Sequence, residues 1–217
     1  MLAAMRVRQD GRLFVFGWSQ GGHAALALQR ELERMRFRVS GTAVVGGVFD
    51  VERWFFTSLT SATLTRPLYA TYLLLAFDDI YDVYASTSDV FRPHYAGIVD
   101  GLFDMRHFFD DVAAELPPPG RDILTESYVA QLTTSRDDPM RVRLRENAVD
   151  RWSPRAPVRV YHSRDDEEVP YDDALVSVDR LRRSGATITV RSFSGLDHAN
   201  SWIQTMPRAI QWFRTLQ

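Results

Sequence analysis

The feature that most constrains this chain is the pattern G-x-S-x-G at residues 17–21. The four residues before it, 13–16, are all large and apolar, which predicts a short buried strand. Apolar residues recur at helical spacing after it, which predicts a helix packed on a sheet. The pattern also arises by chance, but a strand before it and a helix after it favour a serine held on a sharp strand-to-helix turn.

The spacing has a chemical reason. Ser19 must lie on a very tight turn, with its hydroxyl pushed out of the sheet and its backbone strained. Glycine is expected at positions 17 and 21, on either side of Trp18 and Ser19, because a side chain there would collide where strand and helix pass close together. The N–H of Gln20 and the helix dipole would face developing negative charge. The stretch therefore predicts a nucleophilic serine with Gln20 as an oxyanion donor.

Further elements follow in alternation. Strands are expected at 42–49, 156–163 and 187–193, and helices from 170 onward and over 201–216. The helix after the turn is expected to bury four apolar residues: Ala25, Leu28, Leu32 and Met35. Strand–helix–strand alternation predicts the α/β class, with a mainly parallel sheet of about four strands.

Residues 51–151 differ in composition from the segments around them, because they are rich in aromatic residues. Helical spacing is visible over 69–80 and again over 95–112. We expect a helical cap or lid inserted into a core formed by residues 1–50 and 152–217. The aromatic residues suggest an apolar acyl or aryl pocket; the alternative is an extra helical layer that contacts no substrate. Asp50, just before the insertion, is interpreted as a turn or helix-cap residue.

A serine hydroxyl needs a base, and the base needs an orienting carboxylate. His198 follows the last expected strand and is the best of five histidines for the base. The other four are interpreted as structural, surface or cap residues: His23, His94, His107 and His162. The acid is expected after the preceding strand, within the acidic turn at 165–168.

Residues 162–170 read H-S-R-D-D-E-E-V-P and resemble H-G-x-x-D-x-x-V-P of the α/β-hydrolase and prolyl-oligopeptidase-like families. Alignment on both the histidine and Val-Pro selects Asp166, with Asp165 as the runner-up and Ser163 standing where the family often has glycine. Together with the turn at Ser19, the chain resembles roughly the carboxyl-terminal two-thirds of a bacterial α/β-hydrolase with a helical cap, of the esterase and lipase-like kind.

This resemblance implies a serine hydrolase that cleaves small-molecule carboxylic esters through a Ser19–Asp166–His198 triad and an acyl-enzyme, with no cofactor and no metal. The alternatives are a lipase or a prolyl-oligopeptidase-like peptidase. The net charge of −2 does not indicate a nucleic-acid partner. No stretch is long enough to span a bilayer. Residues 1–10 do not read as a signal peptide, so the compartment stays open with the cytoplasm as the default.

In the fold that this resemblance implies, the nucleophile follows the fifth strand, whereas here it is residue 19. We therefore expect the amino-terminal strands, and the loop that supplies the second oxyanion donor, to be missing. If the chain truly starts at Met1, the exposed sheet edge at 13–16 predicts a homo-oligomer, with strand pairing at that edge, which a monomer in light scattering would contradict. The hypothesis from another class is a non-catalytic or assembly-dependent fragment.

Overall fold

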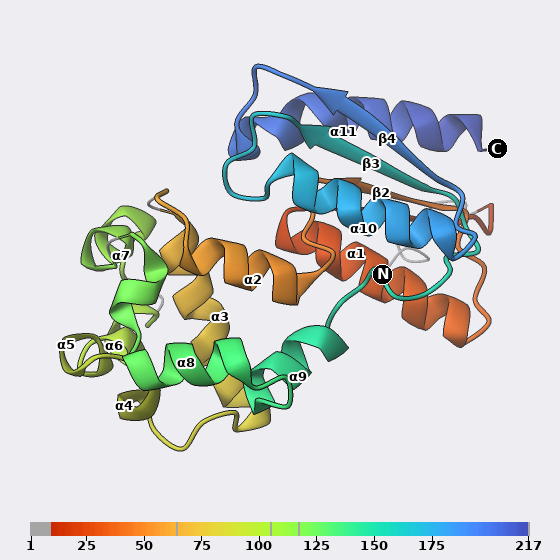
Figure 1. Cartoon of the computed structure of the whole chain (residues 1–217). Coiled ribbons are helices and arrows are strands. Elements are labelled where there is room, and N and C mark those ends of the chain that lie inside the picture. Colours follow the sequence, from red (N-terminus) through yellow and green to blue (C-terminus); the bar gives the residue numbers. More distant parts are fainter. Residues whose placement is uncertain (1–9, 64, 105, 117, 217) are drawn as a thin grey trace. The chain divides into compact units, whose positions relative to one another are not determined.

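The computed structural model describes residues 10–63, 65–104, 106–116 and 118–216, with Thr65 described by its backbone only. The prediction that residues 1–10 are not a signal peptide concerns residues that, apart from Asp10, lie outside the described part of the chain. The chain forms two compact units (Figure 1). The first contains the segments up to Phe49 and from Val149 onward, and the second contains Asp50–Ala148.

The first unit is built on four parallel strands in the order β1-β2-β3-β4. Their bounds are β1 Phe14–Trp18, β2 Gly41–Val45, β3 Val158–Ser163 and β4 Ile188–Phe193. The register pairs Phe14 with Gly41, Thr42 with Val158, and Val158 with Ile188. The predicted α/β class with a parallel sheet of about four strands is confirmed.

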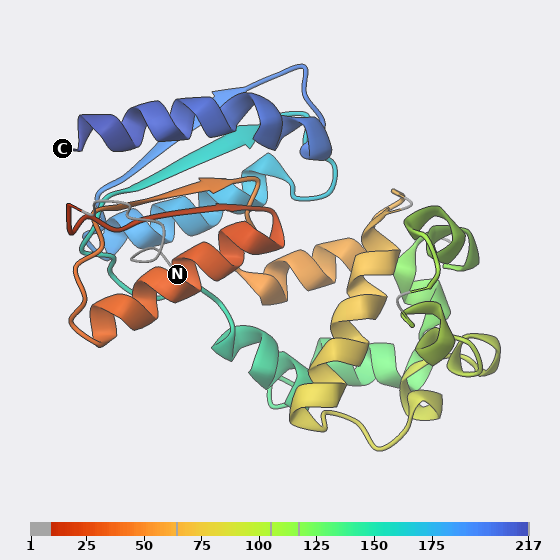
Figure 2. The same ribbon diagram turned by 180° about the vertical axis from the view of Figure 1, so that it is seen from behind.

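Helices cover both faces of this sheet (Figure 2). Helices α1 Gln20–Arg34 and α10 Tyr171–Arg183 lie on one face, and α11 His198–Thr215 lies on the other. Side chains of β2 alternate between the two layers, so Val44 packs with α1 and α10 while Ala43 and Val45 pack with Trp212 of α11. Strand β2, in the interior of the sheet, is thus buried along its whole length.

Strand β2 is shorter than the sequence predicted. The expected strand ran over 42–49, but β2 ends at Val45 because Gly46 has φ +50, in the left-handed region. A residue there leaves the extended conformation, and glycine does so without a Cβ clash. The chain therefore turns at the carboxyl edge of the sheet.

Helix α1 buries only part of the face predicted for it. Ala25 is buried as expected and Leu32 packs against the same core cluster, but Leu28 and Met35 are 49% and 59% exposed. The face that packs on the sheet contains five residues: Gly22, Ala25, Leu26, Gln29 and Glu33. Two of these are polar, so a search for apolar periodicity alone misses part of this face.

The buried Glu33 carboxylate explains why polar residues face inward. Its Oε1 accepts from the backbone N of Ala156 at 3.0 Å and from Nε2 of Gln29 at 2.8 Å, and its Oε2 accepts from the backbone N of Arg155 at 2.9 Å. Gln29 also donates to the carbonyl of Ala156 at 3.2 Å. These bonds satisfy the loop that leads into β3, where buried backbone groups need partners.

The second unit is helical. Its elements are α2 Val51–Leu59, α3 Thr65–Tyr81, α4 Thr87–Val90, α5 Pro93–Ala96, α6 Val99–Leu102, α7 Phe109–Glu115, the 3₁₀ helix η1 Gly120–Ile123, α8 Glu126–Thr134 and α9 Pro139–Glu146. Asp50 caps α2 by accepting from the backbone N of Arg53, as its interpretation as a cap expected. The cap or lid role proposed for residues 51–151 stays a prediction.

The helical pattern predicted over 95–112 is broken into α5, α6 and α7, because Gly97 ends α5 and Phe108 starts a new helix. Met105, within that span, lies outside the described residues. Over the described part of the chain, no helix combines the length and the apolar character needed to cross a membrane.

We expect Glu33→Ala to lower the free energy of unfolding by roughly 2–4 kcal/mol, because it leaves the buried backbone N–H of Ala156 and the part-buried N–H of Arg155 without an acceptor. Urea unfolding followed by circular dichroism measures the change. Glu31→Ala is the matched control, since Glu31 lies on the same helix with its side chain 47% exposed and pairs only with surface arginines. An equal loss in both variants would contradict the role given to Glu33.

Candidate active site

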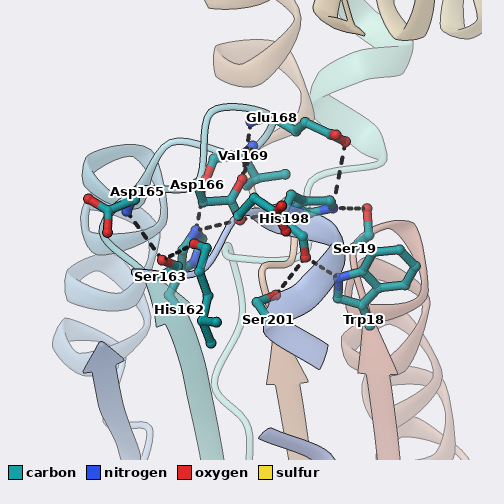
Figure 3. A network of polar contacts seen from close by, with 12 residues as sticks. Trp18, Ser19, His162, Ser163, Asp165, Asp166, Glu168, Val169, His198 and Ser201 are labelled. Carbon is teal, nitrogen blue, oxygen red and sulfur yellow. Dashed lines mark hydrogen bonds and ion pairs between the residues drawn. The ribbon is translucent and has the colours of Figure 1, made fainter. Parts of the chain in front are cut away.

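The residues singled out by the sequence gather at the carboxyl edge of the sheet, in the first unit. Ser19 follows β1, Asp166 follows β3 and His198 follows β4. Figure 3 shows their side chains pointing toward one another above the strand ends. Catalytic and binding groups of open α/β sheets collect at this edge, because the strand-to-helix loops all emerge there.

The turn at Ser19 is as tight as the sequence predicted. A Cβ on Gly17 would lie 1.9 Å from the carbonyl oxygen of Gly21, so only glycine fits. Ser19 has φ 55° and ψ −126°, and its N–H donates to the carbonyl of Val45 at 2.9 Å. A conformation of this kind costs roughly 1–3 kcal/mol and persists only where its surroundings enforce it.

The second glycine of the pattern has a different role from the one expected. A Cβ on Gly21 would meet no atom within 4 Å, so Gly21 contributes its backbone carbonyl to the close approach and not an absent side chain. The position that needs to be small is Gly22, where a Cβ would lie 2.7 Å from Val44 Cγ1 and 3.1 Å from Gly47 Cα. Strand β2 and its following turn therefore select Gly22.

A continuous hydrogen-bond chain joins the serine, histidine and aspartate (Figure 3). The Ser19 hydroxyl lies 2.8 Å from His198 Nε2, and His198 Nδ1 lies 2.8 Å from Asp166 Oδ2. In the neutral tautomer that this geometry favours, His198 donates from Nδ1 to the carboxylate and accepts the hydroxyl proton at Nε2. Such an arrangement can remove a proton from Ser19.

Backbone groups hold the carboxylate in place. Asp166 Oδ1 accepts from the backbone N of Glu168 at 3.1 Å and of Val169 at 2.8 Å, which leaves Oδ2 for His198. Asp166 is 5% exposed and His198 is 4% exposed. Because both oxygens are bonded, the buried charge is compensated and its orientation is fixed.

The start of α11 positions His198. Asp197 caps the helix by accepting from the backbone N of Asn200, and His198 is the first helical residue. Its carbonyl accepts from Trp18 Nε1 at 3.1 Å and from the Ser201 hydroxyl at 2.7 Å. The Trp18 ring lies 5.2 Å from the imidazole, measured between centroids. Trp18 therefore links the serine turn to the histidine.

Gly46 is a site residue that the sequence reasoning missed. A Cβ on it would lie 3.0 Å from Asp166 Oδ2 and 3.2 Å from His198 Cε1. Its positive φ and this crowding together leave room only for glycine beneath the carboxylate–imidazole pair. The signal was the Gly46-Gly47 pair inside the predicted strand, since adjacent glycines mark a break in a strand.

Opposing effects set the pKa of His198. Burial lowers it, but the hydrogen bond and charge of Asp166, together with the charges of Glu168 and Asp197, outweigh burial and raise the pKa above its usual value. Glu168 Oε2 lies 3.9 Å from Nε2, on the side of the ring that faces Ser19. No pattern in the sequence distinguished Glu168 from its acidic neighbours.

The runner-up acid is engaged elsewhere. Asp165 Oδ2 accepts from the backbone N of Gly195 at 2.6 Å, which ties the loop after β3 to the loop after β4. Neighbouring residues in this turn point in different directions, so Asp166 alone of the two reaches His198. The geometry therefore favours Asp166 over Asp165 as the orienting carboxylate.

His162 bonds within its own turn, as expected. It is fully buried, and its Nε2 donates to the carbonyl of Val169 at 2.8 Å while lying 3.5 Å from Asp166 Oδ2. Burial lowers its pKa, partly offset by the charge of Asp166, so it stays neutral and leaves the carboxylate to His198. His23 Nδ1 lies 3.1 Å from the carbonyl of Val48, which fits the structural role expected of it.

Gln20 is the first residue of α1, where backbone N–H groups have no acceptor within the helix. Its amide follows Ser19 directly, the position expected of an oxyanion donor. Within the described ranges, no group of three or more His, Cys, Asp or Glu side chains is placed to hold a metal ion.

Comparisons with known proteins bear on the fold. No protein-family model matches the chain. The chain is 24% identical over 211 residues to the secreted triacylglycerol lipase LIP5 of Malassezia furfur, covering 94% of this chain and 52% of that protein. Among solved structures, the rice cell wall degrading esterase LipA of Xanthomonas oryzae aligns with a TM-score of 0.81 at 22% identity, over 98% of this chain and 59% of LipA.

Two further structures agree. A Legionella pneumophila protein aligns with a TM-score of 0.89 at 19% identity, over 99% of this chain and 59% of its own. Candida antarctica lipase A aligns with a TM-score of 0.75 at 16% identity, over 99% of this chain and 51% of the lipase. The chain has the α/β-hydrolase fold, and it spans between 51% and 59% of the length of these four proteins.

The two glycines of the serine turn should respond differently to alanine. We expect Gly17→Ala to prevent the native turn, because its Cβ would clash with backbone that cannot move independently. Gly21→Ala should fold and gain up to about 1 kcal/mol of helix stability, since its Cβ meets open space. Thermal unfolding of the two variants measures both effects. Equal tolerance of both substitutions would mean that the strand and helix are not held this close together.

Proposed function

We propose that this chain carries the catalytic centre of a serine hydrolase that cleaves carboxylic esters through an acyl-enzyme. The observation that supports this most directly is the hydrogen-bond chain from Ser19 Oγ through His198 to Asp166, with 2.8 Å at both links. It coincides with the strained backbone of Ser19, which fixes the hydroxyl at the edge of the sheet.

In acylation, Ser19 Oγ attacks the ester carbonyl while His198 Nε2 takes its proton. Negative charge develops on the carbonyl oxygen, and the N–H of Gln20 at the start of α1 is our candidate to stabilise it. Asp166 stabilises the imidazolium and keeps its Nδ1 proton directed at Oδ2. His198 then gives its proton to the departing alcohol, leaving the acyl group on Ser19.

Deacylation repeats these steps with water as the nucleophile. His198 Nε2 removes a proton from water, which attacks the acyl carbon, and the proton returns to Ser19 as the carboxylic acid leaves. Burial of Asp166 and His198 shields their interaction from solvent, so their mutual orientation is kept through both halves of the cycle.

We propose esters as the substrate class because the proteins that this chain resembles include one named as an esterase and two named as lipases. A lipase is the second candidate, supported by the match to a triacylglycerol lipase over 94% of this chain. A prolyl-oligopeptidase-like peptidase remains the alternative suggested by residues 162–170 of the sequence alone.

One structural observation supports the alternative hypothesis that the chain is non-catalytic or needs assembly. Strand β1 is at one end of the described sheet, and Leu13, directly before it, is an exposed apolar residue. An open strand edge of this kind favours pairing with another strand. Homo-oligomer formation through residues 13–16 therefore stays a proposal, alongside a requirement for assembly before catalysis.

Labelling with a fluorophosphonate tests whether Ser19 is activated, because the probe requires a nucleophilic serine but little substrate specificity. We expect the wild type to react and the Ser19→Ala and His198→Ala variants not to react. Labelling is read by in-gel fluorescence. A folded wild type that does not react would favour the non-catalytic or assembly-dependent hypothesis.

The two aspartates provide a matched pair in the same experiment. Asp166→Asn should slow labelling by roughly 10³- to 10⁴-fold, because the imidazole loses its orienting charge. Asp165→Asn should retain most of the labelling rate, since Asp165 contacts the backbone of Gly195 and not His198. The reverse order would assign the orienting role to Asp165.

The pH dependence of labelling tests the electrostatics of His198. Only the neutral imidazole can accept the serine proton, so the rate falls as the pH drops through the raised pKa of His198. Glu168→Gln removes a charge that helps to raise this pKa and should move the acid limb to lower pH. Glu167→Gln is the control, because Glu167 is the exposed neighbour and is not among the charges acting on His198. An unchanged limb in Glu168→Gln would contradict this assignment.

A further inference from the structure

A second concave surface of the first unit lies away from the candidate active site. It is a groove of about 350 Å³ between β3, β4 and α11, lined on the helix side by Arg208, Gln211, Trp212 and Thr215. Arg208 follows His198 by 208 − 198 = 10 residues on α11, which at ~1.5 Å per residue is roughly 15 Å along the helix. Figures 1 and 2 show α11 running along these strands.

Three arginines from three different elements line this groove. Arg159 comes from β3, Arg191 from β4 and Arg208 from α11. The register pairs Arg159 with Thr189 and Tyr161 with Arg191, so the two strand arginines lie diagonally on the face that α11 covers. The spacing 208, 211, 212 and 215 places the helix residues on one side of α11.

The charge of this region is one-sided. The chain has 28 acidic residues, yet β3, β4 and α11 contain no aspartate or glutamate. No acidic side chain lines the groove within the described part of the chain. Because guanidinium groups stay charged at any pH that the folded protein meets, three of them around one groove repel one another.

The arginines are held differently. Arg159 is fixed, with its guanidinium 4.6 Å from the Trp212 ring centroid and its Nε donating to Thr189 Oγ1 at 3.2 Å. The side chains of Arg191 and Arg208 make no hydrogen bond or ion pair to another described residue, although both are exposed and line the groove. Arg159 is thus anchored, while Arg191 and Arg208 line the same groove without such an anchor.

We propose that this groove binds the phosphate group of a small molecule. Three guanidinium forks from three directions can each meet a different oxygen of a tetrahedral dianion, whereas a carboxylate offers only two oxygens. Gln211 adds a neutral hydrogen-bond donor on the helix side. Binding of a dianion relieves the repulsion among the arginines, and the volume of about 350 Å³ suits a small ligand.

Isothermal titration with inorganic phosphate tests the proposal, at neutral pH and fixed ionic strength so that screening stays constant. The wild type should bind phosphate saturably, and Arg191→Gln and Arg208→Gln should each weaken the affinity by about tenfold. Arg214→Gln is the matched control: Arg214 is an exposed arginine of the same helix that does not line the groove, so its loss should change the affinity less than about twofold.

A second arm identifies the source of the phosphate group. Vesicles of phosphatidylcholine with and without phosphatidic acid are offered to the same four proteins in a flotation assay. Binding in either arm that is lost in Arg191→Gln and Arg208→Gln but kept in Arg214→Gln supports the site, as a soluble phosphate or as a lipid headgroup respectively. Binding in neither arm, or an equal loss in Arg214→Gln, overturns it.

Two measurements keep this result independent of folding and of the proposed hydrolase activity. The thermal unfolding midpoints of the three variants should be no lower than that of the wild type, because replacing Arg191 or Arg208 removes no side-chain hydrogen bond or ion pair to a described residue and reduces the repulsion in the groove. Fluorophosphonate labelling should also be unchanged. Phosphate binding without fluorophosphonate labelling would contradict the proposed hydrolase activity and still support the phosphate site. Labelling without phosphate binding would contradict only the phosphate site.

Discussion

The close approach of β1 and α1 at Gly17 is the constraint on which the rest of the site depends. With the Gly21 carbonyl where a Cβ of residue 17 would be, strand and helix can be joined only by a turn that puts Ser19 at φ 55°. The N–H of Ser19 then bonds to Val45, which ties this turn to the end of β2. One steric condition in the backbone therefore fixes the serine hydroxyl relative to the sheet, before any side chain orients it.

The other site groups reach Ser19 because parallel strands end at a common edge. Asp166 lies in the loop after β3 and His198 starts the helix after β4, so each is delivered by a different strand. Their positions are then locked by backbone contacts: two N–H groups hold one oxygen of Asp166, and Trp18 and Ser201 hold the carbonyl of His198. Rigid loops of this kind place the reacting groups without a large entropy cost at the moment of reaction.

Helix α11 serves two separate regions of the first unit. Its first residue is His198, whose imidazole lies among the carboxylates of Asp166, Glu168 and Asp197 and has a raised pKa as a result. Its later residues contain no carboxylate, and four of them line the arginine-rich groove beside β4: Arg208, Gln211, Trp212 and Thr215. The two ends of one helix thus lie in electrostatic environments of opposite sign, separated along the axis by several turns. Screening in water over such a distance lets each region act without disturbing the other.

The sequence by itself determined the features that depend on neighbouring residues: a strand, a strained turn and a helix around Ser19, the alternation that gives a parallel sheet, and a short set of candidate acids and bases. Each of these is a local pattern of size, polarity or spacing. Only the tertiary structure decided which candidates meet. It turned Asp166 and not Asp165 toward His198, and it crowded Gly22 and Gly46, which no local pattern had singled out as site residues. It also buried Glu33 on helix α1 and left Leu28 and Met35 exposed, although apolar spacing predicted that these two would be buried. The reason is physical: crowding and burial are set by atoms from distant parts of the chain, and these are adjacent only once the sheet has formed.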